Sequence, residues 1–345
     1  MDFLFTPEQD EAAELAARIL TDRTGNDRLK EVESGGDRFD RGLWKDLDEA
    51  GLLTLHLPEE YGGAGLGLVE LARVLVEAGQ RVAPIPLAVH GACTAVLAAQ
   101  RIDPGELLYA AAVAEERAHL PIAPTVTADA DGALTGTKTL VRAGMTADAL
   151  LVTATGPAGA GVYLVEADAA ERRAQHTSDG DVTALITFDA TPATRIGGVD
   201  VAERLGQLLV ALAAAEQLGV TEGALRLTAE YAKTREQFGR PIGTFQAVSQ
   251  RLADGFIDVL GQRLTLWQAI WRLEEDLPAA TEVATAKLWA ADAGHRIAHT
   301  TVHVHGGVGI DLDGEAHRYF TVGKRFEFLF GGATEQALAI GRSFA

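Results

Sequence analysis

The spacing of apolar residues changes twice along this chain of 345 residues. Up to about Glu106 apolar residues recur at the three- and four-residue steps of helices, and this spacing returns in long segments from Arg204 onward. Between about Ala110 and Arg204 the chain carries short runs rich in Val, Thr and Leu, which are typical of strands. We therefore predict an α+β fold that is mainly α. Its expected parts are an N-terminal helical domain at residues 1–109, a small middle β-barrel-like domain at 110–203 and a C-terminal four-helix bundle at 204–345.

Local signals place the ends of some elements. Thr6, Pro7 and Gln9 have the order of an N-cap, a first helical residue and a capping-box partner, so a helix is expected to begin at Pro7. The pairs Asp131-Gly132 and Asp179-Gly180 mark turns between strand-like runs. Because no helix of ordinary length fits between most of these runs, we expect antiparallel pairing rather than βαβ units.

The long helical segment that begins at Phe245 carries a stripe of aliphatic and aromatic residues, mostly at three- and four-residue steps. Such a stripe most often forms the core of a helical bundle, so we predict that it is buried. Its members are Val248, Leu252, Phe256, Val259, Leu260, Trp267, Ile270 and Trp271.

The charge balance excludes one class of partner. Lys and Arg total 30 against 49 Asp and Glu, a net charge of −19, and no run of Lys or Arg forms a basic stripe, so we expect no nucleic acid. The single cysteine, Cys93, lies in an apolar segment and is expected to be a buried thiol. The acidic N-terminus lacks the basic region of a signal peptide, and no apolar run approaches about 18 residues. We therefore expect a cytoplasmic protein without a membrane partner.

Three motifs that could carry chemistry are weak. The glycines of the Glu59–Leu68 segment lack the GxGxxG spacing and follow no predicted strand, so we expect a connection between helices there. The serines show no GxSxG motif. Four histidines could be metal ligands, but no carboxylate or cysteine nearby completes a set of ligands, so we expect no metal. They are His295, His299, His303 and His305.

The stretch from Tyr231 to Asp254 is the most informative. It places a cation, a ring and an amide, those of Arg235, Phe238 and Gln246, around a connection between two long helices. These groups suit a phosphate-bearing aromatic ligand, and they suit an ordinary packed corner equally well. Farther along, the stretch HVHGGVGID puts adjacent glycines at a helix end, where free N–H groups could receive an anion.

The residues from Arg235 to Gln246 resemble the signature R-x-x-F-G-x-x-I-x-x-F-Q of the acyl-CoA dehydrogenase family. Three further segments resemble the family in order: LPEEYGGAGLG, LTGTKTLVRAGMTADALLVTA, and HVHGGVGIDLDGEAHRYF with His303 in place of a glutamine. The resemblance covers nearly the whole chain. It implies helical, β-barrel-like and four-helix domains, a dimer of dimers, and FAD held across a subunit interface.

The resemblance also implies roles for residues. Arg235, Phe238 and Gln246 would hold the adenine and pyrophosphate side of the flavin, and the segment around His303, Gly306 and Gly307 would reach the cofactor of the neighbouring subunit. The family's T-E-x loop and W-I-T/S strand, which hold the isoalloxazine ring, are absent. The corresponding regions read VAEERAHLPIAP and KTLVR, with Leu140 at the tryptophan position and Arg142 at the hydroxyl position.

The family's catalytic base is absent as well. In the family a glutamate removes the α-proton of an acyl-CoA thioester while the β-hydride passes to flavin N5. At the two family positions of this glutamate the chain has Gly331, in LFGGAT in place of Y-E-G-T, and Leu209. We therefore predict no catalytic residue, and we interpret Glu327 and Glu335, each four residues from Gly331, as solvated charges at a helix end.

These losses predict the subunit without the base in a heteromeric, FAD-dependent acyl-CoA dehydrogenase of α2β2 composition, with the glutamate on a homologous partner. The chain is similar to the short partner subunits of bacterial enzymes that shorten steroid side chains, in particular a partly shortened cholesterol side chain. The implied substrate is a steroid side-chain acyl-CoA. Two alternatives stay open: a self-sufficient homotetramer that uses Glu327 or Glu335, and a scaffold or binding protein that has lost flavin.

Overall fold

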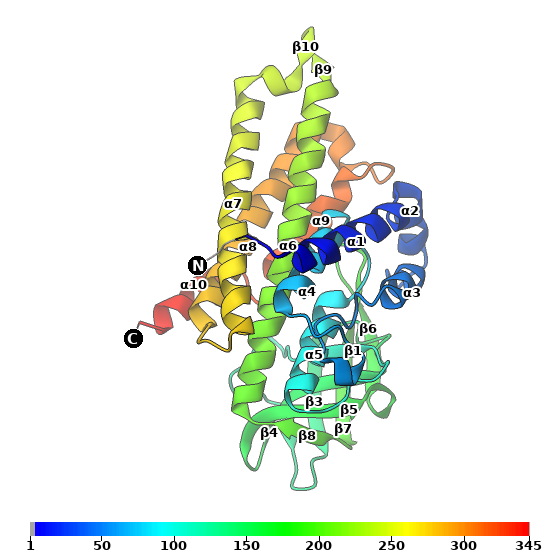
Figure 1. Cartoon of the computed structure of the whole chain (residues 1–345), viewed down its shortest axis with the longest axis vertical. Coiled ribbons are helices and arrows are strands. Elements are labelled where there is room, and N and C mark those ends of the chain that lie inside the picture. The colour runs from blue at the N-terminus through cyan, green and yellow to red at the C-terminus, as the bar shows by residue number, and fades with distance from the viewer. Residues whose placement is uncertain (1–3, 345) are drawn as a thin grey trace. The chain divides into compact units, whose positions relative to one another are not determined.

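The structure is a computed structural model that describes residues 4–344, and Figure 1 shows its helices and strands. The chain forms two compact units. The first consists of Met1–Val32, Leu68–Pro84 and Ala213–Ala345, and the second of Glu33–Gly67 and Ile85–Leu212. The order of elements, with N-terminal helices, a middle β-sheet region and C-terminal helices, confirms the predicted α+β, mainly α fold. The three domain boundaries stay a prediction.

Helices make up most of the first unit. They are α1 (Pro7–Arg23), α2 (Asn26–Ser34), α4 (Leu68–Gln80), α6 (Val199–Thr234), α7 (Gln246–Glu274), α8 (Ala280–His305), α9 (Ala316–Phe328) and α10 (Ala333–Arg342), of which α2 and α6 continue into the second unit. A short hairpin of β9 (Glu236–Gln237) and β10 (Arg240–Pro241) joins α6 to η3 (Ile242–Thr244), and η4 (Gly306–Ile310) follows α8. In Figure 1 the hairpin lies at the top of the view, where α6 ends and the chain turns toward α7.

The local signals in the sequence are confirmed. Thr6 Oγ1 accepts a hydrogen bond from Gln9 N at 3.3 Å, and Gln9 Oε1 accepts one from Thr6 N at 3.0 Å, so α1 begins with the predicted capping box and with Pro7 as its first residue. Gly132 and Gly180 have φ of 89° and 81°, which is the left-handed backbone that such turns require.

Helix α6 is apolar enough to correct one expectation. Among residues 4–344 it is the one helix long and apolar enough, by length and composition, to cross a membrane, although the sequence was expected to hold no such run. Of its most apolar 18-residue window, 89% is buried inside the protein and does not face the surroundings. A Cβ at Gly219 would lie 2.0 Å from Val76 O, and one at Gly79 would lie 2.0 Å from Glu216 O. Because only glycine allows this approach, α6 packs against α4 as a core helix.

The apolar stripe of α7 is only partly buried. Val259 and Ile270 lie in the core as predicted, and Trp267 meets Phe5 edge to face with ring centroids 5.0 Å apart. The prediction is wrong for three of its members, which are exposed beside two further aliphatic residues. The five exposed residues, called here the α7 stripe, are Phe256, Ile257, Leu260, Leu264 and Trp271. Periodicity reports which face of a helix is apolar but not what covers that face.

The second unit is built on an eight-stranded sheet with the order β6-β7-β3-β2-β4-β5-β8, and β1 pairs with β4. Its strands are β1 (Tyr109–Ala112), β2 (Thr127–Ala128), β3 (Leu134–Arg142), β4 (Ala149–Gly156), β5 (Gly159–Glu166), β6 (Glu171–His176), β7 (Val182–Thr191) and β8 (Thr194–Gly197). Most neighbours pair antiparallel as expected, but β1 and β2 each pair parallel to β4. Helices α3 (Arg41–Glu49) and α5 (Leu87–Ala99), with η1 (Glu59–Tyr61) and η2 (Ala167–Ala169), complete the unit.

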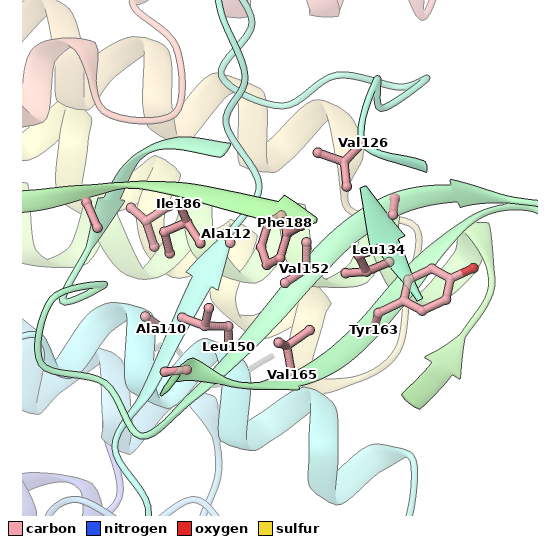
Figure 2. Close-up of a cluster of buried hydrophobic side chains, with 14 of the residues drawn as sticks. Ala110, Ala112, Val126, Leu134, Leu150, Val152, Tyr163, Val165, Ile186 and Phe188 are labelled. Atoms are coloured by element: carbon pink, nitrogen blue, oxygen red, sulfur yellow. The ribbon is translucent and has the colours of Figure 1, made fainter. Parts of the chain in front are cut away.

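Alternate residues of two strands form the core of the sheet. On β7 the cluster takes Ile186 and Phe188, and on β4 it takes Leu150 and Val152, each pair two residues apart. Figure 2 shows these side chains gathered with Leu134, Tyr163 and Val165 from the other strands. Because side chains two apart on a strand point to the same face, each pair faces this cluster, although β4 is buried on both faces from Ala149 to Ala154 and its sequence does not alternate.

Candidate cofactor-binding site

The corner between α6 and α7 presents its three predicted residues to solvent. Arg235 follows the last residue of α6, and its carbonyl accepts a hydrogen bond from Ile242 N at 2.8 Å, which closes the β9–β10 hairpin. Phe238 lies at the hairpin tip with φ of 53° and is 93% exposed, and Arg235 and Gln246 are exposed too. The geometry therefore does not support the packed-corner interpretation, since all three residues are exposed.

A further cation lies in this corner. The guanidinium of Arg240 stacks over the ring of Phe245 at 4.3 Å from its centroid, and Phe238 meets the same ring edge to face at 6.1 Å. Arg240 thus puts a guanidinium group beside two rings, and Arg235 is a second exposed arginine of the same corner. Guanidinium groups bind phosphate oxygens through paired N–H donors, and exposed rings stack on heteroaromatic bases.

The second predicted segment lies at the C-terminal end of α8. His303, Gly306 and Gly307 are exposed, and a Cβ added at either glycine would meet nothing within 4 Å. Gly306 has φ of 65° and caps α8, with its N–H donating to Val302 O. The expectation of free N–H groups for an anion is therefore wrong at Gly306, because this N–H is already used. What the turn offers is open space for another molecule.

The structure brings these two segments together through a ring contact that sequence reasoning did not predict. The rings of Tyr231, on α6, and His305, the last residue of α8, stack with centroids 4.2 Å apart and an interplanar angle of 21°. One turn earlier, Thr228 Oγ1 and Thr301 Oγ1 lie 3.1 Å apart. The hairpin after α6 and the glycine turn after α8 thus belong to the same end of the bundle.

Gly331, which the resemblance assigns to the family's usual base position, lies between α9 and α10. It is buried, with φ of 102°, and Gly332 after it is the N-cap of α10. A Cβ at Gly331 would lie 2.9 Å from Gln336 Nε2 and 3.3 Å from Glu335 Oε2. The other base position, Leu209, is a buried residue of α6. Neither position offers a titratable group.

The two glutamates near Gly331 are both engaged. Glu335 is exposed, and its carboxylate accepts a hydrogen bond from Gly332 N at 2.9 Å, which satisfies the N-cap N–H at the start of α10. Glu327 is only 15% exposed, and its carboxylate contacts Lys324 Nζ and lies 3.0 Å from His295 Nδ1. The solvated-charge interpretation fits Glu335 and is wrong for Glu327, because α8 supplies a partner that local sequence does not reveal.

A buried lysine, Lys287, lies next to Glu327. Lys287 Nζ donates to the carbonyl oxygens of Phe326 at 2.7 Å and Glu327 at 3.2 Å, and so caps the C-terminal end of α9. Burial lowers the pKa of Lys287 to about 7. Among residues 4–344, no group of three His, Cys, Asp or Glu side chains is arranged to hold a metal ion.

In the sheet region, the residues at the isoalloxazine positions serve internal contacts. Arg142 is buried, donates from Nη2 to Ile85 O at 3.0 Å, and lies 3.5 Å through Nε from Asp181 Oδ2. Leu140 has φ of 52°, and its N–H donates to Gln175 Oε1 at 2.9 Å. A guanidinium held by two acceptors replaces the hydroxyl of the family pattern.

The segment at the T-E-x position also makes contacts within the protein. The Glu115 carboxylate accepts hydrogen bonds from Lys138 Nζ at 2.7 Å and from Thr125 N at 2.8 Å, and Lys138 Nζ further donates to Thr153 Oγ1 at 3.0 Å. Burial acts to raise the pKa of Glu115, but hydrogen bonds from Lys138 and Thr125 outweigh it and lower this pKa overall. Burial lowers the pKa of Lys138 to about 8. The pair ties this segment to β3.

These observations fit one half of FAD and not the other. The corner and the glycine turn supply exposed guanidinium groups, rings and open space, which suit an adenine and a pyrophosphate. The sheet region has neither the stacking tryptophan nor the hydroxyl, and Arg142 is engaged with Ile85 and Asp181. This chain by itself is therefore not built to hold the isoalloxazine ring.

The fold and the motifs define the class of protein. Residues 198–344 match the model of the acyl-CoA dehydrogenase C-terminal domain, and residues 6–102 match that of the N-terminal domain. The chain belongs to the acyl-CoA dehydrogenase family, whose members use FAD.

Particular relatives narrow the comparison. The chain is 43% identical to acyl-CoA dehydrogenase FadE27 of Mycobacterium tuberculosis, over 100% of this chain and 99% of the relative. The solved ChsE4-ChsE5 complex from Mycobacterium tuberculosis contains a chain with 42% identity and a TM-score of 0.94, covering 100% of this chain and 99% of that one. The Tcur3481-Tcur3483 steroid ACAD G363A variant has 39% identity and a TM-score of 0.93, covering 98% and 97%. Each of these two structural neighbours is named for a pair of proteins, and the Tcur3481-Tcur3483 pair is described as a steroid ACAD.

Proposed function

We propose that the chain is the subunit without the catalytic base in a heteromeric, FAD-dependent acyl-CoA dehydrogenase that desaturates a steroid side-chain acyl-CoA between its α and β carbons. The observation that carries this proposal is Gly331, at the usual base position, together with the buried Leu209 at the other. Proton removal from the α-carbon requires a basic group within hydrogen-bond reach. A homologous partner in an α2β2 assembly supplies the glutamate. We also propose a cytoplasmic location.

The chain's own residues have a binding role in this proposal. Arg235 and the neighbouring Arg240 offer positive charge to the cofactor's pyrophosphate, Phe238 offers a ring to the adenine, and Gln246 offers an amide. When bound, FAD would supply the acceptor for the hydride, and the partner would supply the pocket for the isoalloxazine ring. His303, Gly306 and Gly307 form the edge that faces the cofactor from the other segment.

Exposed apolar surface supports a partner. The α7 stripe is an aliphatic and aromatic face on a single helix, and Val308, Ile310 and Leu312 are exposed around the glycine turn. Contiguous apolar surface of this kind commonly marks an interface. The paired proteins among the structural neighbours, one pair of which is a steroid ACAD, support the same occupant, a homologous subunit.

The test is co-expression of this chain with a homologous subunit that carries the glutamate, followed by measurement of flavin content and turnover. We expect FAD and activity in the complex only. If the chain alone forms a homotetramer with one FAD per subunit and desaturates an acyl-CoA, the proposal fails. A complex that stays colourless under all conditions would instead favour a scaffold that has lost flavin.

Replacing Arg235 with glutamine tests its cofactor role. A charged hydrogen bond contributes about 1.5–3 kcal/mol, so Arg235→Gln is expected to weaken FAD binding by the complex about 10-fold or more. Arg173→Gln removes an exposed arginine from β6 and serves as the control, with unchanged affinity expected. Fluorescence titration of the apo complex with FAD measures both. Equal affinities for the two variants would contradict the assignment.

The self-sufficient alternative has its own test. Glu327→Gln and Glu335→Gln, each in the co-expressed complex and in the chain alone, are expected to leave turnover unchanged, because one carboxylate is paired with His295 and Lys324 and the other caps α10. Loss of turnover in either variant, with its thermal midpoint unchanged, would identify that glutamate as the base.

A further inference from the structure

The ends of α6 and α8 each lead into a candidate cofactor-facing segment, and one ring contact joins them. Tyr231 lies four residues before Arg235, and His305 directly precedes Gly306. Their rings stack almost parallel, with centroids 4.2 Å apart. His305 is buried, so the contact is shielded from solvent. Because this contact lies just before both segments, it affects the direction in which each segment leaves its helix.

The imidazole of His305 is fixed in one orientation. Its Nδ1 lies 2.8 Å from Thr301 O, a carbonyl that can only accept, so Nδ1 carries the hydrogen. Burial lowers the pKa of His305, which keeps the ring neutral at pH 7. A neutral ring held at its Nδ1 presents its face, and not a charge, to Tyr231.

The same residue also fixes the glycine turn. Gly309 in η4 folds back on the last turn of α8, where a Cβ at Gly309 would lie 3.0 Å from His305 Cβ and 2.9 Å from Val302 Cα. His305 thus lies against η4 on one side, and its ring stacks on α6 on the other. The hydrogen-bonding contact between Thr228 and Thr301, one turn earlier, holds the two helices at the same spacing.

We propose that His305, stacked on Tyr231, is a positioning residue that sets the placement of the β9–β10 hairpin relative to the Gly306-Gly307 turn. Both segments then face one cofactor at a fixed separation. This inference rests on the proposed function for its cofactor, but the coupling between the two segments is a property of the chain itself.

The experiment uses the co-expressed complex with His305→Ala and with His305→Phe, which keeps a flat ring of similar size. We expect His305→Ala to weaken FAD binding roughly three- to tenfold, the range that an aromatic stack supports, and His305→Phe to recover most of this loss. His299→Ala removes an exposed histidine from the same helix and is expected to leave affinity unchanged. A residue that only stabilises the fold would lower the thermal midpoint without this pattern of recovery.

A second readout does not depend on the cofactor. Amide hydrogen exchange at residues 236–240 and 306–310, measured without FAD, is expected to rise in both segments in His305→Ala and to return in His305→Phe. Tyr231→Leu, which breaks the stack from α6, is expected to give the same double increase if His305→Ala does not fold. Unchanged exchange at the hairpin in both variants overturns the inference. If the wild-type complex binds no FAD yet the exchange remains coupled, the proposed function fails and the positioning role stands.

Discussion

Glutamate at position 331 would place a carboxylate where most of the family carries its base, so Gly331→Glu asks whether one substitution restores the missing chemistry. We expect that it does not. The backbone at Gly331 has φ of 102°, and the space next to its Cα is bordered by the side chains of Gln336 and Glu335. The loop conformation requires glycine at position 331. A side chain there therefore distorts the loop and does not act on a substrate.

The magnitude follows from two contributions. A residue with a Cβ in left-handed backbone costs about 1–2 kcal/mol. Its Cβ would lie 2.9 Å from Gln336 Nε2, which donates to Phe330 O at 3.2 Å, so the amide must move and this hydrogen bond, worth about 0.5–1.5 kcal/mol, is weakened. Together they cost about 1.5–3.5 kcal/mol, and each kcal/mol lowers the thermal midpoint by about 2–4 °C in a unit of this size. Gly331→Ala isolates this part from the effect of charge.

The assay combines differential scanning calorimetry with acyl-CoA turnover of the chain alone and of the complex. Gly341→Ala is the matched control, because Gly341 lies in α10 where a Cβ meets nothing within 4 Å, and alanine in a helix is about 0.5–1 kcal/mol better than glycine. We expect a lower midpoint for both variants at position 331, a slightly higher one for Gly341→Ala, and no new turnover. A Gly331→Glu chain that desaturates substrate alone, with its midpoint unchanged, would falsify the reasoning.

Two further predictions concern stability. Burial lowers the pKa of His56 to about 4 and that of His90 to about 3; since the unfolded histidines take up protons near pH 6.5 and the folded ones do not, stability falls as pH drops from 6.5 toward 4, by about 1.4 kcal/mol per pH unit for each. Urea midpoints at pH 7 and pH 5 measure this loss of stability. Replacing both histidines with glutamine should reduce the difference between the two midpoints. Equal midpoints at the two pH values in the wild type would contradict the prediction. Lys138→Met leaves the Glu115 carboxylate buried without its cation and is expected to cost about 3–5 kcal/mol, whereas adding Glu115→Gln should recover part of it; equal urea midpoints for the single and double variants would refute the pairing.

Much of the fold could be predicted from the sequence because it depends on local chemistry. The capping box of α1 and the turns at Gly132 and Gly180 involve neighbours within a few residues, and the structure confirms them. The change from helical to strand spacing gave the mainly helical α+β order for the same reason. The parallel pairing of β1 with β4 could not be predicted from spacing, because it joins segments that other strands separate in the sequence.

The candidate site was only partly predictable. The sequence placed Arg235, Phe238 and Gln246 around a connection between two long helices, which the structure confirms, whereas their exposure was not predicted and their role toward FAD stays a prediction. The stack of Tyr231 on His305 was missed, since two rings far apart in the sequence carry no joint signal. The engagement of Glu327 was missed for the same reason, because its partners lie on α8 as well as α9.

The exposed α7 stripe has a consequence for the life of the protein in a cell. A newly made chain that has not met its partner displays Phe256, Leu264 and Trp271 to every chaperone and protease it encounters. If the partner covers this face, mass action makes the survival of each subunit depend on the concentration of the other. Matched synthesis of the two chains then becomes a condition for either to accumulate, and unequal expression leaves an orphan that is cleared or aggregates.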